Sequence, residues 1–446
     1  MRRSMDDLLQ VLPPPTAALL EALVAGADRC GVRVFLVGGP VRDLLLDRPL
    51  RDVDLVIVGR QGVGAVSVAR EGAPAGARVI EHERFGTVTV ATGETSIDVT
   101  SVRRESYRHP GALPEVAHGS LEEDLQRRDF SVNALALPLN TAQRAEPVAV
   151  IDVDNGLRDL EEHRLRVLHK RSFHDDPTRA LRAARLAPRL GFSLTRGSRS
   201  VLRDALRDGA FGAVSGDRLR RELEKTFEDA ARGLNPAEVF RRLSDWHVLS
   251  ALQPGLTLAR EAVFPLRRLG KLIAEPQWGS PQNRPWAAGL AVWLAPLPPA
   301  LRRRTLQRFS VRGELAKRLA GFPRDRDRWL SALAAARGRG VVDAALGDLD
   351  EERLRALYAW APESIRRRIV RFAAEDRGRR LPVSGADLVA LGLSGPAIGR
   401  ALARIRLAYL DGGVANREEA LALALELARS RKPSRGGDRR PRSGKP

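Results

Sequence analysis

Residues 30–100 carry an alternation of strand and helix patterns that constrains the fold more than any other feature of the chain. A β-branched run at 32–37 stops at Gly38-Gly39, and a helix pattern starting with Pro40 follows, since proline favours the first position of a helix. The later elements expected here are strands at 53–58, 78–80, 87–91 and 96–100 and a helix of small residues at 63–70. The pattern predicts a small α/β domain.

The strand patterns end near Leu160, and segments of helical period rich in Arg, Leu, Ala and Glu fill the rest of the chain. Breaks are expected at Gly191-Phe192, at Asn235-Pro236 and at 296–299. Because one hydrophobic core stops growing at roughly 250–300 residues, a chain of 446 residues predicts several domains. The predicted fold class is α+β, with a small N-terminal α/β domain followed by an elongated all-helical remainder.

The formal net charge is +20, which favours polyanion partners, nucleic acid before an anionic membrane surface. Only six of the 75 basic residues are lysine, so part of this charge can reflect coding bias. The tail at 431–446 has seven basic residues against one acidic residue and is expected to be disordered. Cys30 is the single cysteine, which excludes an intramolecular disulfide framework. The start of the chain, 1–15, has no apolar run of signal-peptide length, and no stretch elsewhere approaches the roughly 18 uncharged apolar residues of a membrane span. A soluble, cytoplasmic protein is therefore expected.

Two features at the start of the α/β domain carry chemistry. Adjacent glycines at Gly38-Gly39 let backbone N–H groups approach an anion closely, and the helix dipole that follows favours a phosphate there. Asp52 and Asp54 are two apart on a strand and point to one face, where their repulsion is costly unless a cation lies between them. Mg²⁺ prefers carboxylate oxygens together with substrate phosphates. The alternatives are a plain turn and a solvated strand end.

Asp98 is a third candidate carboxylate, because it is a polar residue inside the β-branched run at 96–100. It is expected to face Asp52 and Asp54 across the sheet. The alternative is an edge or strand-end residue without a role in chemistry.

The order of these motifs resembles the nucleotidyltransferase superfamily that includes DNA polymerase β-like enzymes. Within it, the chain resembles the bacterial-type (class II) tRNA nucleotidyltransferase and poly(A) polymerase family, over about the first 250 residues and a patch near the C-terminus. The motifs are Leu36-Val-Gly-Gly-Pro-Val-Arg-Asp with Asp52-Val-Asp54, Arg127-Arg-Asp-Phe-Ser-Val-Asn-Ala134, Asp175-Asp-Pro-Thr-Arg179 with the helix leading to Phe192, and the glycine-containing stretch 392–399. Pro40 after the glycine pair and Asp175 in place of Glu depart from the usual pattern.

The resemblance implies roles at the matching positions. Asp52 and Asp54 would bind the catalytic metal ions. Asp98 remains the candidate for a third catalytic carboxylate on its strand position, and the sequence leaves open which residue supplies it. The nucleotide would be bound by Gly38, Gly39, Arg42, Arg128, Asp129, Asn133, Asp176 and Arg179. Asp176 and Arg179 are three apart, so on a helix they would share a face, where carboxylate and guanidinium complement the edges of cytosine and adenine. The alternative is that Asp176 and Arg179 form an ion pair within one helix and have no role in base recognition.

The implied organisation is a nucleotidyltransferase head (1–160), a neck for base recognition (161–235), a body (236–345), an RNA-binding tail (346–430) and the basic tail (431–446). In the helical part, the arginines at 302–304 and 366–368 and the helix start within 392–399 are expected to contact RNA phosphates.

The expected reaction is Mg²⁺-dependent addition of CMP from CTP, AMP from ATP, or both, to the 3′ end of tRNA. One alternative is a poly(A) polymerase acting on general RNA 3′ ends, and another is a non-catalytic RNA-binding protein on the same scaffold. The sequence leaves open whether CCA, CC or A alone is added.

Overall fold

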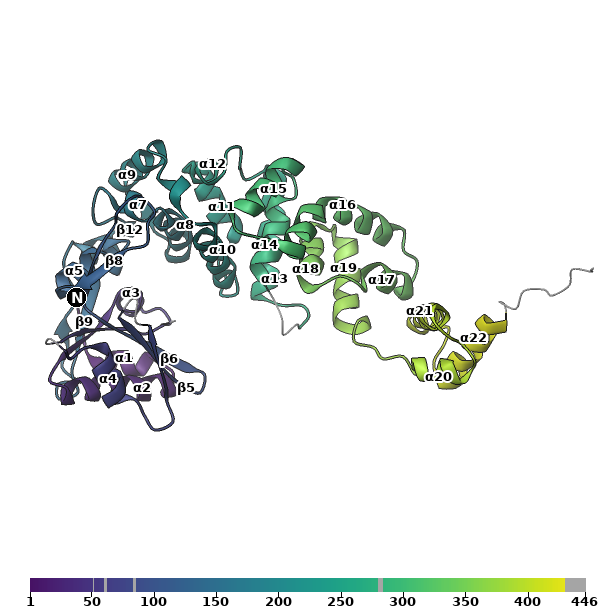
Figure 1. Cartoon of the computed structure of the whole chain (residues 1–446), viewed down its shortest axis with the longest axis horizontal. Coiled ribbons are helices and arrows are strands. Elements are labelled where there is room, and N and C mark those ends of the chain that lie inside the picture. Colours follow the sequence, from purple (N-terminus) through teal and green to yellow (C-terminus); the bar gives the residue numbers. More distant parts are fainter. Residues whose placement is uncertain (51, 60–61, 83–85, 280–283, 430–446) are drawn as a thin grey trace, which may run out of the picture. The chain divides into compact units, whose positions relative to one another are not determined.

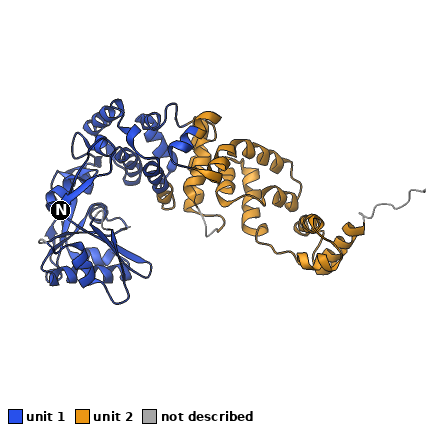
Figure 2. Ribbon diagram, in the orientation of Figure 1, with its two compact units in different colours: residues 1–226, 234–258, 304–311 blue, residues 227–233, 259–303, 312–446 orange. Residues whose placement is uncertain are grey.

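The computed structural model describes residues 1–50, 52–59, 62–82, 86–279 and 284–429. It divides into two compact units, each described by itself below (Figure 2). Unit 1 comprises residues 1–226, 234–258 and 304–311, and unit 2 comprises 227–233, 259–303 and 312–446. Arg51 and the predicted basic tail at 431–446 lie outside the described residues. The division into head, neck, body and tail stays a prediction.

A mixed seven-stranded sheet organises the N-terminal part of unit 1 (Figure 1). Strand β3 pairs in parallel with β6, whereas the other neighbouring strands of this sheet, within the described ranges, pair antiparallel. In the order of the sheet the strands are β11 (Ile151–Asp152), β9 (Leu135–Leu139), β2 (Arg33–Val37), β3 (Asp54–Val58), β6 (Thr95–Ser101), β5 (Thr87–Thr92) and β4 (Arg78–His82). The five strands and two helices expected from the sequence at 32–100 are confirmed, to within a few residues at their ends.

Both faces of the sheet are covered. Helices α2 (Pro14–Arg29) and α4 (Ala65–Gly72) pack together and against β6. On the opposite face, Phe35, Val37 and Val56 form a core with Leu125 of α5 (Leu121–Gln126). Burial on both faces explains the nearly continuous apolar run of β2, in place of an alternating pattern. Helix α3 (Gly39–Leu45) follows β2 directly and contacts β2 and β9.

Short elements complete the region around this sheet. They are β1 (Arg2–Arg3) paired with β10 (Val148–Ala149), α1 (Met5–Val11), the hairpin of β7 (Arg103–Ser106) and β8 (Glu115–His118), and the 3-10 turn η2 (Ser131–Asn133). Strands β12 (Arg164–Leu165) and β13 (Ser193–Leu194) form a two-stranded parallel sheet. The expectation that strands vanish after Leu160 is therefore wrong for these four residues.

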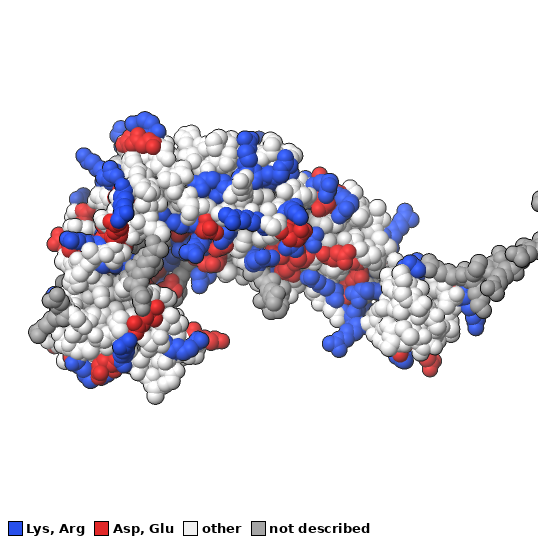
Figure 3. Space-filling view, viewed as in Figure 1, with Lys and Arg blue, Asp and Glu red and all other residues white. Residues whose placement is uncertain are grey.

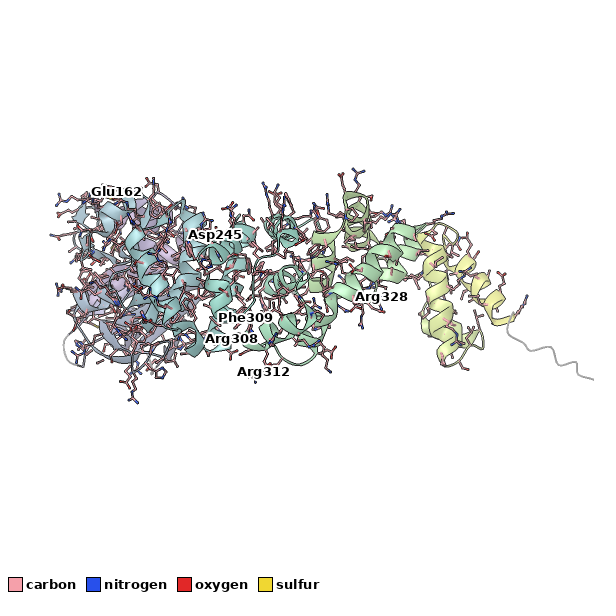
Figure 4. All side chains as sticks on the ribbon, turned by 90° about the horizontal axis from the view of Figure 1, so that it is seen from above. Glu162, Asp245, Arg308, Phe309, Arg312 and Arg328 are labelled. Atoms are coloured by element: carbon pink, nitrogen blue, oxygen red, sulfur yellow. The ribbon has the colours of Figure 1, made fainter. Side chains whose placement is uncertain are left out.

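Helices account for the rest of unit 1. Helix α11 begins at Pro236, at one of the breaks expected from the sequence, and the Asn235 side chain caps it by accepting a hydrogen bond from the Ala237 N–H. The Arg308 guanidinium donates to the carbonyls of Phe211, Val214 and Leu252, next to the fully buried Phe309 (Figure 4). The helices between residues 156 and 252 are α6 (Gly156–Glu161), α7 (Ser172–Asp175), α8 (Thr178–Leu190), α9 (Arg196–Arg207), η3 (Ala210–Ala213), α10 (Gly216–Ala230), α11 (Pro236–Asp245) and α12 (Val248–Leu252).

The described part of unit 2 is helical, which confirms the α+β fold class with a helical remainder. A separate small core at its C-terminal end contains Leu388, Ile405 and Ala420. The helices after residue 259 are α13 (Arg260–Ala274), α14 (Pro285–Leu294), α15 (Pro299–Arg308), α16 (Gly313–Ala335), α17 (Arg339–Leu346), α18 (Glu351–Trp360), α19 (Glu363–Arg371), η4 (Phe372–Asp376), α20 (Gly385–Ala390), α21 (Pro396–Leu410) and α22 (Arg417–Arg429).

Basic and acidic side chains are interspersed over the helical elements in the view of Figure 3. Within the described ranges, no helix has the length and apolar character needed to cross a membrane.

Candidate active site

The parallel pairing of β3 with β6 brings two carboxylates together. Asp54 and Asp98 are direct partners in the register, so their side chains project from the same face of the sheet. The Asp98 carboxylate accepts a hydrogen bond from the Thr89 hydroxyl at 2.6 Å, which fixes it on β6. The expectation that Asp98 faces Asp54 across the sheet is confirmed.

The environment of Asp54 disfavours its charged form. Burial, together with the like charges of Asp52 and Asp98, raises the pKa of Asp54 to about 6, against the opposing effect of Arg128 and Arg182. A carboxylate cluster of this kind gains stability from a bound cation.

Asp52 is exposed and precedes the first residue of β3 by two positions. Within the described ranges, no three His, Cys, Asp or Glu side chains come together as a metal-binding group. The three aspartates are therefore not a preformed three-ligand site. Mg²⁺ is commonly bound by one or two carboxylates together with substrate phosphates, and Asp52 and Asp54 match that smaller requirement.

The glycine pair shapes the turn between β2 and α3. Gly38 has φ of 77°, a conformation that residues with a side chain rarely adopt. A Cβ atom at Gly38 would lie 2.5 Å from Nη1 of Arg128, so glycine lets this guanidinium lie against the turn. The turn, Arg128 and Asp54 therefore belong to one locality.

Arg42 is a buried residue, although the sequence suggested a place at the nucleotide triphosphate. Its side chain is 3% exposed and donates to Asp43 and to the Asn133 side-chain oxygen. Asn133 in turn donates to Asp129 at 2.8 Å. The guanidinium of Arg42 thus has protein partners and holds Asn133 in place.

Asp129 links this network to α8. Its second carboxylate oxygen lies 3.1 Å from Nη2 of Arg182. Although burial acts to raise it, the pKa of Asp129 is held below its ordinary value by Arg182, by the hydrogen bond from Asn133 and by Arg179. Asp129 therefore stays ionised and anchors Arg182 near Asp54.

Asp43 forms a second connection to α8. Its two oxygens accept from Arg42 at 2.7 Å and from Arg189 at 2.9 Å, and its side chain is 4% exposed. Arg48 adds hydrogen bonds to the carbonyls of Arg189 and Leu190 at the end of α8. Helix α8 is thus bound to the glycine-turn helix at one end and to Asp129 near its middle.

Arg127 and Arg128 are oriented by one buried carboxylate. Asp124 accepts from Arg127 at 2.8 Å and from Arg128 at 3.1 Å, and its side chain is fully buried. Although burial acts to raise the pKa of Asp124, Arg128 and Arg127 hold it below its ordinary value. Both arginines follow the C-terminal end of α5, and the ion pair with Asp124 holds Arg128 beside Gly38.

The expectation that Asp176 and Arg179 share a helical face is wrong. Asp176 lies between α7 and α8 with an extended backbone, because the residue before a proline, here Pro177, avoids the helical conformation. Its Oδ1 accepts from the Thr178 N–H, from the Thr178 hydroxyl and from Arg218 at 2.7 Å. Among the described residues, no hydrogen bond reaches Oδ2, which leaves that oxygen as an acceptor.

Arg179 is 4% exposed and donates to the Ser172 hydroxyl and the Arg127 carbonyl. It lines a cavity of about 590 Å³ with Arg127, Asp175 and Tyr107, whereas Asp176 is not among the lining residues. The intrahelical Asp–Arg pair considered as an alternative is absent from the described structure, because Asp176 pairs with Arg218 instead.

Two of the arginines expected to contact RNA have main-chain partners within the protein. Arg302 is buried and donates to the carbonyls of Ala295 and Leu297, and Arg368 donates to those of Leu333 and Ala336. The prediction of phosphate contacts is wrong for these two residues. Arg303 and Arg304 are exposed. Helix α21 begins at Pro396 after Gly395, so the helix start expected within 392–399 is confirmed, and its contact with phosphate stays a prediction.

Sequence reasoning missed the arginines of α8 that face this site. Arg182 and Arg189 are seven residues apart, which places them on one side of a helix. That spacing was visible in the sequence, but the acidic partners Asp129 and Asp43 lie 53 and 146 residues away and carry no local signal.

Known proteins resemble the chain over most of its length. Residues 34–166 match a family model described as the poly A polymerase head domain. The chain is 32% identical over 436 residues to an A-adding tRNA nucleotidyltransferase of Halalkalibacterium halodurans, covering 93% of each protein. It is 34% identical over 416 residues to a CC-adding tRNA nucleotidyltransferase of Deinococcus radiodurans, covering 92% of each.

A third relative is longer. An A-adding tRNA nucleotidyltransferase of Geobacter sulfurreducens is 32% identical over 443 residues, and the chain spans about half of its length, 49%. Among solved structures, an apo form of a CCA-adding enzyme has a TM-score of 0.75 at 28% identity and covers 96% of this chain and 99% of its own. The Thermotoga maritima CCA-adding enzyme in complex with tRNA has a TM-score of 0.71 at 26% identity and covers 97% of this chain and 100% of its own.

We predict that Asp124→Asn lowers stability by about 2–4 kcal/mol at pH 7, because two guanidinium groups lose a buried carboxylate. The pKa of Asp124 is lower in the folded protein than in the unfolded chain. The ionised Asp124 carboxylate therefore stabilises the folded protein at pH values above the unfolded-state pKa of about 3.9, and this stabilisation is lost as the pH falls below that pKa. Thermal unfolding measured from pH 7 to pH 3 should show the difference from wild type shrinking below about pH 4. Glu122→Gln, an exposed change on the same helix, is the control, and a constant difference would contradict the assignment.

We also predict strong coupling between Asp43 and Arg189. Breaking a buried ion pair costs about 3–5 kcal/mol, and contacting residues show coupling energies of about 0.5–3 kcal/mol. In a double-mutant cycle of Asp43→Ala and Arg189→Ala followed by urea unfolding, the two losses should not add. The exposed pair Asp204–Arg207 serves as the control, with coupling below about 0.5 kcal/mol. Additive losses for Asp43 and Arg189 would show that the two helices are held by other contacts.

Proposed function

Because the chain belongs to the tRNA nucleotidyltransferase family, we propose that it adds CMP, AMP or both to the 3′ end of tRNA without a nucleic-acid template. The observation that carries this proposal is the placement of Asp54 opposite Asp98 on β3 and β6, beside the glycine turn and Arg128. In the proposed reaction the RNA 3′-hydroxyl oxygen forms a bond to the α-phosphorus of CTP or ATP. The bond from that phosphorus to the bridging oxygen breaks, and pyrophosphate leaves.

The donor set at β3 fits a divalent metal ion, and we propose Mg²⁺ held by Asp52 and Asp54. Both are hard oxygen donors, and the Asp54 carboxylate lies beside Asp98, so a cation placed there would offset the like charges. When bound, the metal ion would activate the hydroxyl and neutralise charge on the phosphates. The Asp98 carboxylate lies next to Asp54 and is held by Thr89, so it can accept the proton of the attacking hydroxyl.

The nucleotide would be positioned from two sides. Gly38 lets Arg128 lie against the turn, where Asp124 holds its guanidinium, and this guanidinium would contact the triphosphate beside the glycine pair Gly38-Gly39. Arg182 contributes a second guanidinium from α8. Asp129 and Asn133 are candidates for the ribose. Arg42 acts as a positioning residue because it is buried and each of its three guanidinium nitrogens donates to Asp43 or Asn133.

We propose that Asp176 and Arg179 select the base, although Asp176 lies between α7 and α8 and Arg179 lies within α8. Thr178 and Arg218 hold Oδ1 of Asp176, so Oδ2 can accept from the exocyclic amine of cytosine or adenine. Arg179 uses two N–H groups on Ser172 and Arg127, and a guanidinium has five. Uracil and guanine carry a carbonyl in place of that amine, which Asp176 would repel.

One relative is named for adding A and another for adding CC, so their names do not decide which nucleotides this chain adds. The nucleotides added are therefore measured directly. Three substrates distinguish the options: tRNA without its CCA end, tRNA ending in CC, and an oligo(A) primer. Extension of the primer alone would favour the poly(A) polymerase alternative. If none of the three substrates is extended, the remaining alternative is a non-catalytic RNA-binding protein.

We predict that Asp52→Ala or Asp54→Ala abolishes nucleotide addition on these substrates while tRNA binding stays near wild type. Each change removes a proposed metal ligand and relieves like-charge repulsion, so the melting temperature should change little or rise. Arg207→Ala, an exposed change on α9, is the control. Turnover above about a tenth of wild type at saturating Mg²⁺ would contradict the proposed metal site.

We predict that Arg179→Ala reduces the preference for CTP and ATP over UTP and GTP by on the order of tenfold or more, since a site built to hydrogen-bond one base rejects others by several kcal/mol. The measurement is kcat/KM for all four nucleotides on one tRNA. Arg179→Lys retains the charge but loses the two-pronged donor geometry, so it should restore turnover more than discrimination. An equal loss for all four nucleotides would mean that Arg179 only supports Ser172 and the Arg127 carbonyl.

A further inference from the structure

One face of α13 combines an exposed aromatic ring with unpaired basic side chains. Phe264 is 71% exposed, the largest value among the exposed large hydrophobic residues of the described chain. Arg260, Arg267 and Lys271 are also exposed and, with Phe264, fall within an arc of roughly 60° on a helix with 3.6 residues per turn. We call these four residues the α13 stripe. It extends about 16 Å along the helix axis.

The cations of the α13 stripe differ from most arginines of the chain. Within the described residues, Arg260, Arg267 and Lys271 have no side-chain hydrogen bond or ion pair, whereas the neighbouring Arg268 donates to the carbonyls of Ala359 and Ala361. Of the acidic residues on or next to α13, Glu261 lies outside the arc of the stripe, and Glu275, which follows the last helical residue, forms no ion pair with Lys271 in the described structure. The stripe therefore presents uncompensated positive charge around an exposed ring.

The opposite side of α13 is firmly held. Ala262, Leu266, Leu269, Leu272 and Ile273 are buried, and the helix packs on α14 and α18. Because this helix is anchored by its apolar side and by Arg268, the exposed residues are displayed on a rigid element. Exposure of Phe264 leaves apolar area in water with no gain to the fold itself.

We propose that the α13 stripe is an RNA-binding surface on which Arg260, Arg267 and Lys271 contact phosphates and Phe264 stacks on an exposed nucleobase. Phosphate contacts by cations together with an aromatic platform are the general means of binding unpaired nucleotides. A self-association surface would repel its own copy through three uncompensated cations, whereas RNA supplies the complementary charge. The inference rests on the proposed function for its substrate, tRNA.

The charge of the stripe is tested by binding of the tRNA transcript at roughly 50–300 mM KCl. The triple variant R260Q/R267Q/K271Q should weaken binding and lower the slope of log K against log salt by about 2–3, since each phosphate contact contributes about 0.7–0.9. The matched control is K317Q/R324Q/R328Q on α16, which removes the same charge from exposed residues that have acidic neighbours. An unchanged slope, or the same change in both triple variants, would overturn the proposal.

The ring is tested separately. Phe264→Ala and Phe264→Leu should each weaken tRNA binding about fivefold or more, and Phe264→Trp should retain it, because stacking requires an aromatic face. The melting temperature should stay the same, as the side chain is exposed. Retained affinity in Phe264→Leu, or dissociation of an oligomer by Phe264→Ala in sedimentation, would overturn the assignment to a nucleobase.

Catalysis separates this inference from the proposed function. The stripe variants should keep the wild-type turnover at saturating tRNA and an unchanged KM for CTP and ATP. If the wild-type protein extends tRNA and the variants bind it equally well, the stripe proposal fails and the proposed function stands. If the wild-type protein neither binds nor extends tRNA, both fail.

Discussion

The buried carboxylate of Asp43 is the interaction on which the arrangement of the candidate active site depends. It joins Arg42, on the helix that follows the glycine turn, to Arg189 at the end of α8. Arg42 leads through Asn133 to Asp129, and Asp129 returns to α8 at Arg182. The closed circuit fixes groups of the sheet relative to α8, which is the arrangement that the proposed nucleotide site requires.

Arginine serves this protein largely as an internal connector. Arg302, Arg308 and Arg368 donate to main-chain carbonyls at or near the ends of helices. A guanidinium can satisfy several carbonyls at once with its five donors. A net charge of +20 is consequently a weak guide to where RNA binds, and the absence of a partner within the protein is the more useful criterion.

Much of the sheet and of the carboxylate placement could be predicted from the sequence, because strand period, the glycine pair and the spacing of Asp52 and Asp54 are local signals. The pairing of Asp98 with Asp54 followed from their being polar positions in β-branched strands. The three-residue spacing of Asp176 and Arg179 predicted one helical face, but Pro177 keeps the residue before it out of the helical conformation, so Asp176 lies outside the helix. The partners of Asp43, Asp129 and Asp124 depend on tertiary contacts between distant segments, and composition does not indicate which arginines they bind.

The parallel alignment of β3 with β6 has a consequence for which changes in chain length the protein can tolerate. Residues that join α4 to β4 lie outside the ladder that aligns Asp98 with Asp54, so insertions there need not disturb it. A one-residue deletion inside β6 before Asp98 would instead turn its carboxylate to the opposite face, where α2 and α4 pack. Natural variation in length should therefore accumulate in the connections and be absent from the first half of β6.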